Sequence, residues 1–210
     1  MKPCEPLMWL ADFSRLDFLH PPVDCAHMKW KVTRSRDVLV TVPFTVQEME
    51  LENSRGPMSH SFHRISPPDW ANVLPITDDN QAILIRQPRA GAMEMILETP
   101  GGTLDPDESN PETAAARELE EETGYISRRI THVSSVNPNP ALFSNKIHFF
   151  LAEGCHINPD RKHFPDGSEE IDIVLVPVDE LEAMVRRDEI DHALSALGVL
   201  LCLGRLRSGK

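Results

Sequence analysis

The sequence is poor in basic residues relative to acidic ones. Its 21 Lys and Arg stand against 33 Asp and Glu, which gives a formal net charge of −12. Proteins that bind nucleic-acid polymers concentrate Lys and Arg on the binding surface, so this balance argues against such a partner. A small anionic substrate stays compatible with it, provided that a metal ion and a few local arginines neutralise the substrate's charge.

Cysteine is also scarce, and the four cysteines form no recognisable pattern. They are scattered along the chain without a CxxC pair, at Cys4, Cys25, Cys155 and Cys202. Four cysteines in 210 residues do not suggest a disulfide framework, and no zinc-ligand spacing is present. We therefore expect isolated thiols in a reducing cytoplasm.

Long apolar runs are absent as well. The N-terminal segment has no continuous apolar core and contains Asp12 and Asp17, so we do not expect a secretory signal. The longest apolar stretch near the C-terminus, 193–203, is too short to cross a bilayer. With 40% hydrophobic and 26% charged residues, the composition is that of a soluble globular protein, for which we expect a cytoplasmic location.

The most informative segment that is present is the acidic run 117–124, RELEEETG. In a helix, the spacing of 3.6 residues per turn places Glu118, Glu121 and Glu122 on one face. Like charges so placed repel one another by about a few tenths of a kcal/mol per exposed pair. A bound cation turns this repulsion into attraction, and hard divalent ions take carboxylate oxygens together with substrate phosphates. The run therefore predicts a metal-binding helix.

This segment resembles the Nudix box, whose pattern is G-x5-E-x7-R-E-U-x-E-E-x-G-U with U a bulky apolar residue. The matching residues are Gly102, Glu108, Arg117, Glu118, Glu121, Glu122, Gly124 and Tyr125. Eight residues separate Glu108 from Arg117, where the pattern has seven. We expect the extra residue in the loop at Ser109-Asn110, because Ser or Asn caps a helix well and Pro111 suits the first helical position. The helix then keeps its phase, and the place of Glu108 near the metal stays open.

The apolar periodicity predicts mixed strands with segregated helices, which indicates an α+β fold. Strands are expected within 28–52 (two or three) and near 60–65, 70–76, 81–87, 93–98, 130–136, 146–152 and 171–177. Helices are expected at 111–123, 178–187 and 189–206. The resemblance implies a Nudix α/β/α sandwich with a mixed sheet. We divide the chain into an N-terminal arm and β-rich segment, 1–65, and a Nudix domain, 66–210.

Segments outside the box resemble the ADP-ribose pyrophosphatase branch of this family. AILIRQPR followed by LETPGG is similar to the R-Q-Y-R and E-x-P-G-G motifs of that branch, with Arg86, Gln87 and Arg89 matching and Pro88 in place of the aromatic residue. Pro140 stands about fifteen residues beyond the box, where the branch also has a proline. The resemblance implies hydrolysis of a nucleoside diphosphate sugar at its pyrophosphate, with ADP-ribose as the first candidate.

The same resemblance implies the metal ligands. Mg²⁺ or Mn²⁺ is expected on Glu118 and Glu122, with Glu121 helping and the carbonyl of Gly101 as a backbone ligand. Arg117 is expected to pair with a box carboxylate and hold it in place, because its planar guanidinium suits bidentate contact. Glu121, Glu122 and Arg117 are thus the expected catalytic residues of the helix.

A general base is expected from a loop beyond the box, as is common in the branch. The candidate loop is DRKHFPDGSEEID, in which Glu169 is the first choice, followed by Glu170 and Asp166. Such a base must reach the attacking water directly or through one further water.

Substrate contacts are expected from four other residues that match the branch. Arg86 and Arg89 are expected to meet diphosphate or ribose oxygens, although arginines at strand ends also commonly form surface ion pairs. Glu98, just before the Gly-Gly turn, and Pro140 complete the expected set.

Two alternative functions stay open at this stage. One is a Nudix hydrolase for another nucleoside diphosphate compound, such as a sugar nucleotide or a dinucleotide, because Pro88 departs from the branch. The other is a non-catalytic ligand-binding module, which would commonly have lost the carboxylates that this chain keeps. The branch usually forms homodimers through its N-terminal strands, and an added β arm has edges that need a partner. We therefore expect a homodimer.

Overall fold

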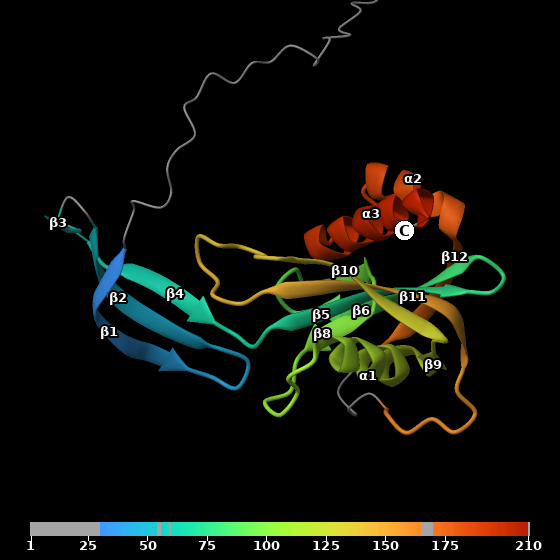
Figure 1. Ribbon diagram of the computed structural model, residues 1–210, viewed down its shortest axis with the longest axis horizontal. Coiled ribbons are helices and arrows are strands. Elements are labelled where there is room, and N and C mark those ends of the chain that lie inside the picture. The colour runs from blue at the N-terminus through green and yellow to red at the C-terminus, as the bar shows by residue number, and fades with distance from the viewer. Residues whose placement is uncertain (1–29, 54–55, 59, 165–169, 210) are drawn as a thin grey trace, which may run out of the picture.

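The computed structural model describes residues 30–53, 56–58, 60–164 and 170–209. These residues form two sheets (Figure 1). The larger sheet has eight strands, and helices cover both of its faces, whereas the smaller one has four strands and extends from one end of the core. The expected mixed sheet in an α/β/α sandwich with N-terminal strands is confirmed.

The larger sheet is mixed, with the central order β10-β11-β5-β6-β12. Strands β11 and β5 run parallel, whereas the other pairs are antiparallel. The strands are β5 Trp70–Thr77, β6 Gln81–Arg89, β7 Glu94–Glu98, β8 Gly101–Thr103, β9 Tyr125–Ile126, β10 Arg129–Val136, β11 Ile147–Ile157 and β12 Asp172–Pro177.

Helix α1, Pro111–Thr123, covers one face of this sheet (Figure 1). The other face carries α2, Leu181–Arg186, which follows the 3₁₀ turn Val178–Glu180, and α3, Ala193–Ser208. None of the helices in the described ranges is long and apolar enough to cross a membrane.

The core consists of two apolar clusters, one on each face of the sheet. Because successive strand residues point to opposite faces, Val73 and Ile83 join the cluster under α1, whereas Leu74 and Leu84 join the cluster under α2 and α3. All four side chains are fully buried. This two-sided burial explains why β5 and β6 read as continuous apolar runs rather than as alternating strands.

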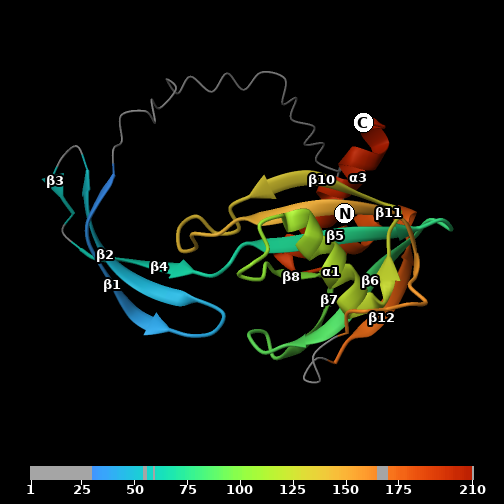
Figure 2. The ribbon, with the colours of Figure 1, turned by 60° about the horizontal axis from the view of Figure 1, so that its bottom comes forward.

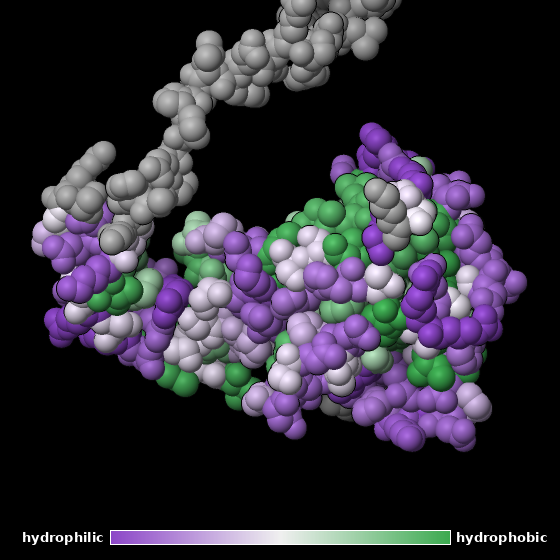
Figure 3. All heavy atoms as spheres, in the orientation of Figure 1, coloured by the Kyte–Doolittle hydropathy of each residue, from purple (hydrophilic) through white to green (hydrophobic). Residues whose placement is uncertain are grey.

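The smaller sheet is formed by β1 Lys31–Val40, β2 Thr45–Asn53, β3 Gly56–Pro57 and β4 Phe62–Ser66. Strand β2 pairs with the other three, and every residue of β1 is exposed. Among the residues that the structure describes, no helix lies over this sheet in either ribbon view (Figure 2), and its visible surface mixes hydrophilic and hydrophobic residues (Figure 3). It connects to the core where Ile65 forms a bridge with Phe143.

The predicted elements agree with the structure except at short or broken segments. The predicted helix 111–123 is confirmed without a shift. The expected helix 189–206 is wrong at its start, because the extended backbone of His192 delays α3 to Ala193. The expected helix 178–187 is divided into a 3₁₀ turn and α2. Strands β3, β8 and β9 were not predicted, since two or three residues carry no periodicity, and β11 continues to Ile157, beyond the predicted end at residue 152.

Candidate active site

Helix α1 is capped at both ends, and its N-cap is one of the two residues expected there. The side chain of Asn110 accepts a hydrogen bond from the Glu112 N–H at 3.1 Å, and Pro111 occupies the first turn. The helix ends at Gly124, whose φ of 74° lies in the left-handed region that glycine favours. The extra residue therefore changes only the loop before Pro111, and the acidic face keeps its phase.

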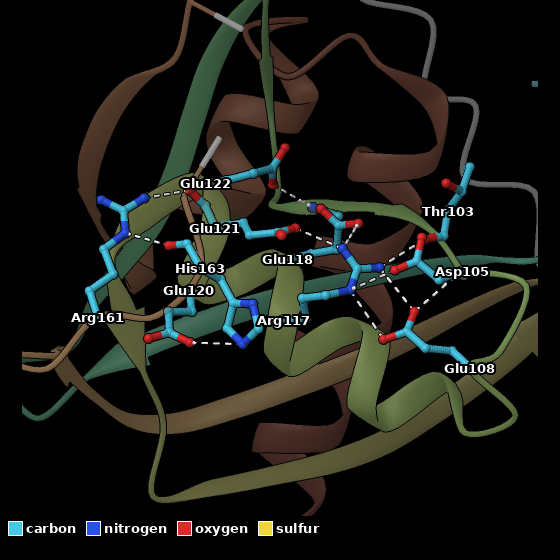
Figure 4. Close-up of polar contacts among 11 residues, drawn as sticks. Thr103, Asp105, Glu108, Arg117, Glu118, Glu120, Glu121, Glu122, Arg161 and His163 are labelled. Carbon is cyan, nitrogen blue, oxygen red and sulfur yellow. Dashed lines mark hydrogen bonds and ion pairs between the residues drawn. The ribbon is translucent and has the colours of Figure 1, made fainter. Parts of the chain in front are cut away.

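Arg117 is the centre of the polar network on this helix (Figure 4). Its Nε and Nη2 donate to the two oxygens of Glu108 at 3.1 and 3.0 Å. Its Nη1 donates to Glu118 at 2.9 Å and to Glu121 at 2.7 Å. Nη2 also donates to the carbonyl of Thr103 at 3.0 Å. One guanidinium thus fixes the direction of three carboxylates.

Glu108 reaches Arg117 in spite of the longer loop. The Glu108 carboxylate also accepts the N–H of Asp105 at 2.9 Å, which closes the loop back on itself. The hydrogen bond from Arg117 is the largest cause that holds the pKa of Glu108 below its ordinary value, and it outweighs the effect of burial. The hydrogen bond to Glu108, together with the contacts to Glu118 and Glu121, raises the pKa of Arg117 above its ordinary value. Glu108 and Arg117 therefore form a charged pair near neutral pH.

Strand β8 lies against the acidic face through two glycines. The N–H of Gly101 donates to Glu122 at 2.8 Å. A Cβ atom on Gly102 would lie only 2.4 Å from Oε1 of Glu118, and one on Gly101 would lie 2.3 Å from the carbonyl oxygen of Ala71. Glycine is therefore required at Gly101, where the neighbouring atoms are backbone, whereas a side chain at Gly102 would displace the Glu118 carboxylate.

The donor set of this face suits a hard divalent cation. Glu108, Glu118 and Glu121 share the single positive charge of Arg117, so the face is net negative, and carboxylate oxygens are the ligands that Mg²⁺ prefers. Among the described residues, no three ligand side chains already converge as a preformed metal cluster. Instead, Glu118 and Glu121 both accept from Nη1 of Arg117, and Glu122 accepts from the N–H of Gly101.

A cavity of about 280 Å³ shares residues Gly101–Thr103 with this acidic face. Its walls include Trp70, Arg89, Glu98 and His192. Arg89 donates to both oxygens of Glu98, at 2.8 and 2.6 Å, and Glu98 is only 3% exposed. The structure thus brings two of the four expected substrate residues, Arg89 and Glu98, to one cavity beside the expected metal ligands.

The other expected residues lie elsewhere. Arg86 lines a separate depression with Glu94 and Asp191, because positions three apart on a strand point to opposite faces. Pro140 lies in the loop between β10 and β11, in a groove at the junction with the smaller sheet.

The expected general base cannot be placed in this network. Glu169 and Asp166 lie outside the described residues, and Glu170 is described and exposed.

Sequence reasoning missed two residues that take part in the site. Glu120 is buried and accepts hydrogen bonds from the Asn158 side chain at 2.6 Å and the Lys162 N–H at 2.9 Å, so it attaches the loop that follows β11 to α1. Burial raises the pKa of Glu120, but these two hydrogen bonds outweigh it and leave the pKa below its ordinary value. The second missed residue is His192, which lines the cavity. Glu120 stands at the variable position of the box, and no motif surrounds His192, so the local sequence identifies neither residue.

Comparison with known proteins agrees with this geometry. Residues 67–195 match the model of the NUDIX domain. The chain is 29% identical over 154 residues to the ADP-ribose pyrophosphatase of Bacillus subtilis (strain 168), a match that covers 73% of this chain and 80% of that protein. It is 28% identical over 179 residues to the CMP-5'-(N-acetyl-N-hydroxy-3-aminopropyl)phosphonate hydrolase of Streptomyces rubellomurinus (strain ATCC 31215), covering 84% of each.

A solved structure shows the same fold. The crystal structure of an ADP compounds hydrolase superposes with a TM-score of 0.76 at 24% identity, and it covers 86% of this chain and 96% of that chain. The family model spans more than half of the chain, and the carboxylates of the box are retained on one helix face. The chain therefore belongs to the Nudix family and is a Nudix pyrophosphohydrolase, with an ADP-ribose pyrophosphatase among its relatives.

Proposed function

We propose that the protein hydrolyses the pyrophosphate bond of a nucleoside diphosphate sugar, with ADP-ribose to AMP and ribose 5-phosphate as the first candidate. The observation that carries this proposal is the strand Gly101–Thr103, which borders the acidic face of α1 and a cavity at once. A substrate can thus place its pyrophosphate at the carboxylates and one end in the cavity. Relatives named ADP-ribose pyrophosphatase and ADP compounds hydrolase support this substrate class.

The proposed cofactor is Mg²⁺ or Mn²⁺, since hydrolases of this family generally need a divalent metal. Glu118, Glu121 and Glu122, with the carbonyl of Gly101, would hold it. When bound, the ion would neutralise pyrophosphate oxygens and make a bound water more nucleophilic. Without it, the negative face of α1 would repel the substrate.

The residues of the chain itself are assigned as follows. Arg117 keeps Glu118 and Glu121 pointed toward β8 and is itself held by Glu108. Arg89 faces the cavity, where it would contact substrate oxygens while Glu98 keeps its guanidinium in one orientation.

Three further residues have proposed roles, although none of them contacts the acidic face or lines the cavity in the part of the chain that the structure describes. Glu169 stays the proposed general base, on the segment that continues from the loop attached to Glu120. Arg86 and Pro140 would contact a substrate only where it extends beyond the cavity.

The proposal includes a cytoplasmic homodimer. Every residue of strand β1 is exposed, and it carries apolar side chains that are about half exposed or more, among them Val32, Leu39 and Val40. Such a strand is expected to be covered by a partner subunit. The buried free thiols of Cys155 and Cys202 fit a reducing compartment. Light scattering after size exclusion should return twice the mass of one chain, and a monomer at micromolar concentration would contradict the dimer.

A second candidate is hydrolysis of another nucleoside diphosphate compound or of a related nucleotide conjugate. It is supported by the relative named as a CMP-phosphonate hydrolase, which covers more of this chain than the ADP-ribose pyrophosphatase does. A non-catalytic binding module is the less favoured alternative, because the acidic face of α1 is complete.

The test is a panel of nucleoside diphosphate sugars, dinucleotides and CMP conjugates, assayed with Mg²⁺ or Mn²⁺ by following nucleoside monophosphate release. We expect ADP-ribose to be cleaved to AMP and ribose 5-phosphate. Glu122→Gln should lose this activity, whereas Glu112→Gln, an exposed residue of the first turn of α1, should keep it. If the unmutated protein cleaves no pyrophosphate compound, the enzyme proposal fails.

A further inference from the structure

His192 borders the cavity from the start of α3, and buried polar groups fix its ring from behind. Its Nδ1 lies 2.9 Å from Oγ of Ser195, a residue that is fully buried. The Ser195 Oγ accepts the N–H of Thr99 at 3.2 Å, and the Thr99 hydroxyl donates to Asn72 at 2.9 Å. This chain of hydrogen bonds joins His192 to the core, so the ring is held more firmly than its partial exposure suggests.

These contacts determine which nitrogen of His192 carries hydrogen. The Ser195 oxygen already accepts a hydrogen bond from Thr99, so its own hydrogen needs an acceptor, and Nδ1 of His192 is the acceptor at hand. A neutral imidazole that accepts at Nδ1 carries its hydrogen on Nε2, and a protonated one carries hydrogen there too. Nε2 is therefore a donor in either charge state.

The nearby carboxylate does not change this assignment. Oε2 of Glu98 lies 3.5 Å from Nδ1 of His192, beyond the Ser195 contact. Glu98 is already paired with Arg89 through both of its oxygens. Because the charges of Arg89 and Glu98 balance each other, Glu98 does not require His192 as a second cation. In the part of the chain that the structure describes, the polar contacts of the ring all run through Nδ1, which leaves Nε2 for a ligand.

We propose that His192 is a specificity residue, whose Nε2–H donates a hydrogen bond to an acceptor on the nucleoside end of the substrate. The cavity of about 280 Å³ is small for a whole nucleoside diphosphate sugar, because pockets that enclose drug-sized ligands run from about 300 to 1,000 Å³. It therefore holds one end. Trp70 in its wall supplies a flat aromatic surface, which suits a nucleobase. This inference rests on the proposed function.

The test compares two substitutions that each keep one half of the imidazole. Gln places a side-chain N–H near the position of Nε2, whereas Asn places its polar group near Nδ1 and leaves the Nε2 position empty. We expect His192→Asn to raise KM for ADP-ribose about three- to tenfold, the range of one neutral hydrogen bond, with kcat unchanged. His192→Gln should stay within about twofold of the unmutated protein in both constants.

The outcomes separate recognition from a merely structural role. If His192→Asn leaves KM unchanged, or if His192→Gln and His192→Asn raise it equally, the proposal is overturned. A loss confined to kcat would also overturn it, because the residue would then act on the chemical step. His156→Asn is the matched control, since His156 is exposed and outside the cavity lining.

Failure of the proposed function stays distinguishable from failure of this inference. If the unmutated protein cleaves no pyrophosphate compound, the same variants are compared by the Kd of AMP, measured by calorimetry with Mg²⁺ present. A three- to tenfold weaker Kd for His192→Asn alone, about the worth of one hydrogen bond, supports the role of His192. Equal Kd values for all variants overturn it.

Discussion

The acidic face of α1 and the cavity meet along Gly101–Thr103, yet the two regions are built in different ways. The acidic face comes from one short stretch of helix, whose side chains are arranged by a single arginine. The cavity is assembled from β5, β6, β7 and the start of α3, through Trp70, Arg89, Glu98 and His192. In the proposed function, a local motif would thus supply the chemistry, and distant parts of the chain would supply the recognition.

The two regions also differ in charge. The acidic face has more carboxylates than cations, and in the proposed function it would need a metal ion to accept a pyrophosphate. In the cavity, the Arg89–Glu98 pair is internally neutral, so binding there depends on shape and hydrogen bonds. Changes on the helix side should therefore reduce kcat or metal affinity, and changes on the cavity side should raise KM.

After the loss of a proposed metal ligand, the largest effect is expected from Gly102→Ala. The new methyl group would lie 2.4 Å from the Glu118 carboxylate, which must then leave its contact with Arg117. We expect kcat for ADP-ribose to fall about 10²-fold, because displacing a group at the site of the reaction by about 1 Å can lower the rate by this factor. Gly91→Ala is the control, since a Cβ there meets nothing within 4 Å. Equal rates for both variants would show that β8 does not fix the acidic face.

Arg89→Lys should change KM more than kcat. Lys cannot make the bidentate contact with Glu98, so its ammonium group is not held toward the cavity. We expect KM for ADP-ribose to rise about tenfold, the worth of one charge-assisted hydrogen bond. Arg128→Lys is the matched control, since Arg128 forms an equivalent bidentate pair with Asp78 at an exposed site outside the cavity lining, and it should leave KM unchanged. If the two variants behave alike, Arg89 has no particular place in recognition.

Glu108→Gln should have a smaller effect on kcat. Arg117 keeps Glu118 and Glu121 but loses the carboxylate that holds its other edge, so we expect kcat to fall about fivefold. Steady-state rates at saturating Mg²⁺ check this. An unchanged kcat would mean that Glu118 and Glu121 alone hold Arg117 in place.

The same variant tests the lowered pKa of Glu108. A carboxyl whose pKa is depressed by folding stabilises the native state above its unfolded pKa and loses this effect as the pH falls through the folded value. The difference in the free energy of unfolding between the unmutated protein and Glu108→Gln should therefore be largest near neutral pH and shrink in acid. A difference that does not vary with pH would contradict the ionised pair.

The smallest effect on activity is expected from Asn110→Ala. Loss of this N-cap should lower the free energy of unfolding by about 1 kcal/mol, or Tm by about 2–4 °C for a chain of this size, with kcat and KM unchanged. Thermal unfolding followed by circular dichroism measures it. A drop in kcat without a drop in Tm would show that the cap loop takes part in the chemistry.

The sequence predicts α1 and its acidic face well because every signal there is local. Asn110, Pro111 and Gly124 mark the ends of the helix, and the spacing of the glutamates sets their common face. The contact of Glu108 with Arg117 depends on how the longer loop closes through the Asp105 N–H, which spacing alone does not give.

The cavity is predictable only in part. Arg89 and Glu98 belong to motifs and were identified, but which strand face each arginine occupies depends on the register of β6 with β7. His192 enters the cavity because α3 docks on the sheet with Ser195 buried against Thr99, a contact between residues 96 positions apart. Hydrophobic periodicity gives no information on contacts of this kind.

The most direct test of the account is a steady-state comparison of Glu122→Gln and His192→Asn on ADP-ribose with Mg²⁺. We expect Glu122→Gln to lose roughly 10³-fold in kcat, because metal-assisted catalysis is worth several kcal/mol. His192→Asn should instead keep kcat and raise KM about three- to tenfold. If Glu122→Gln retains kcat, or if both variants change the same constant, the division between a catalytic helix and a recognition cavity is wrong.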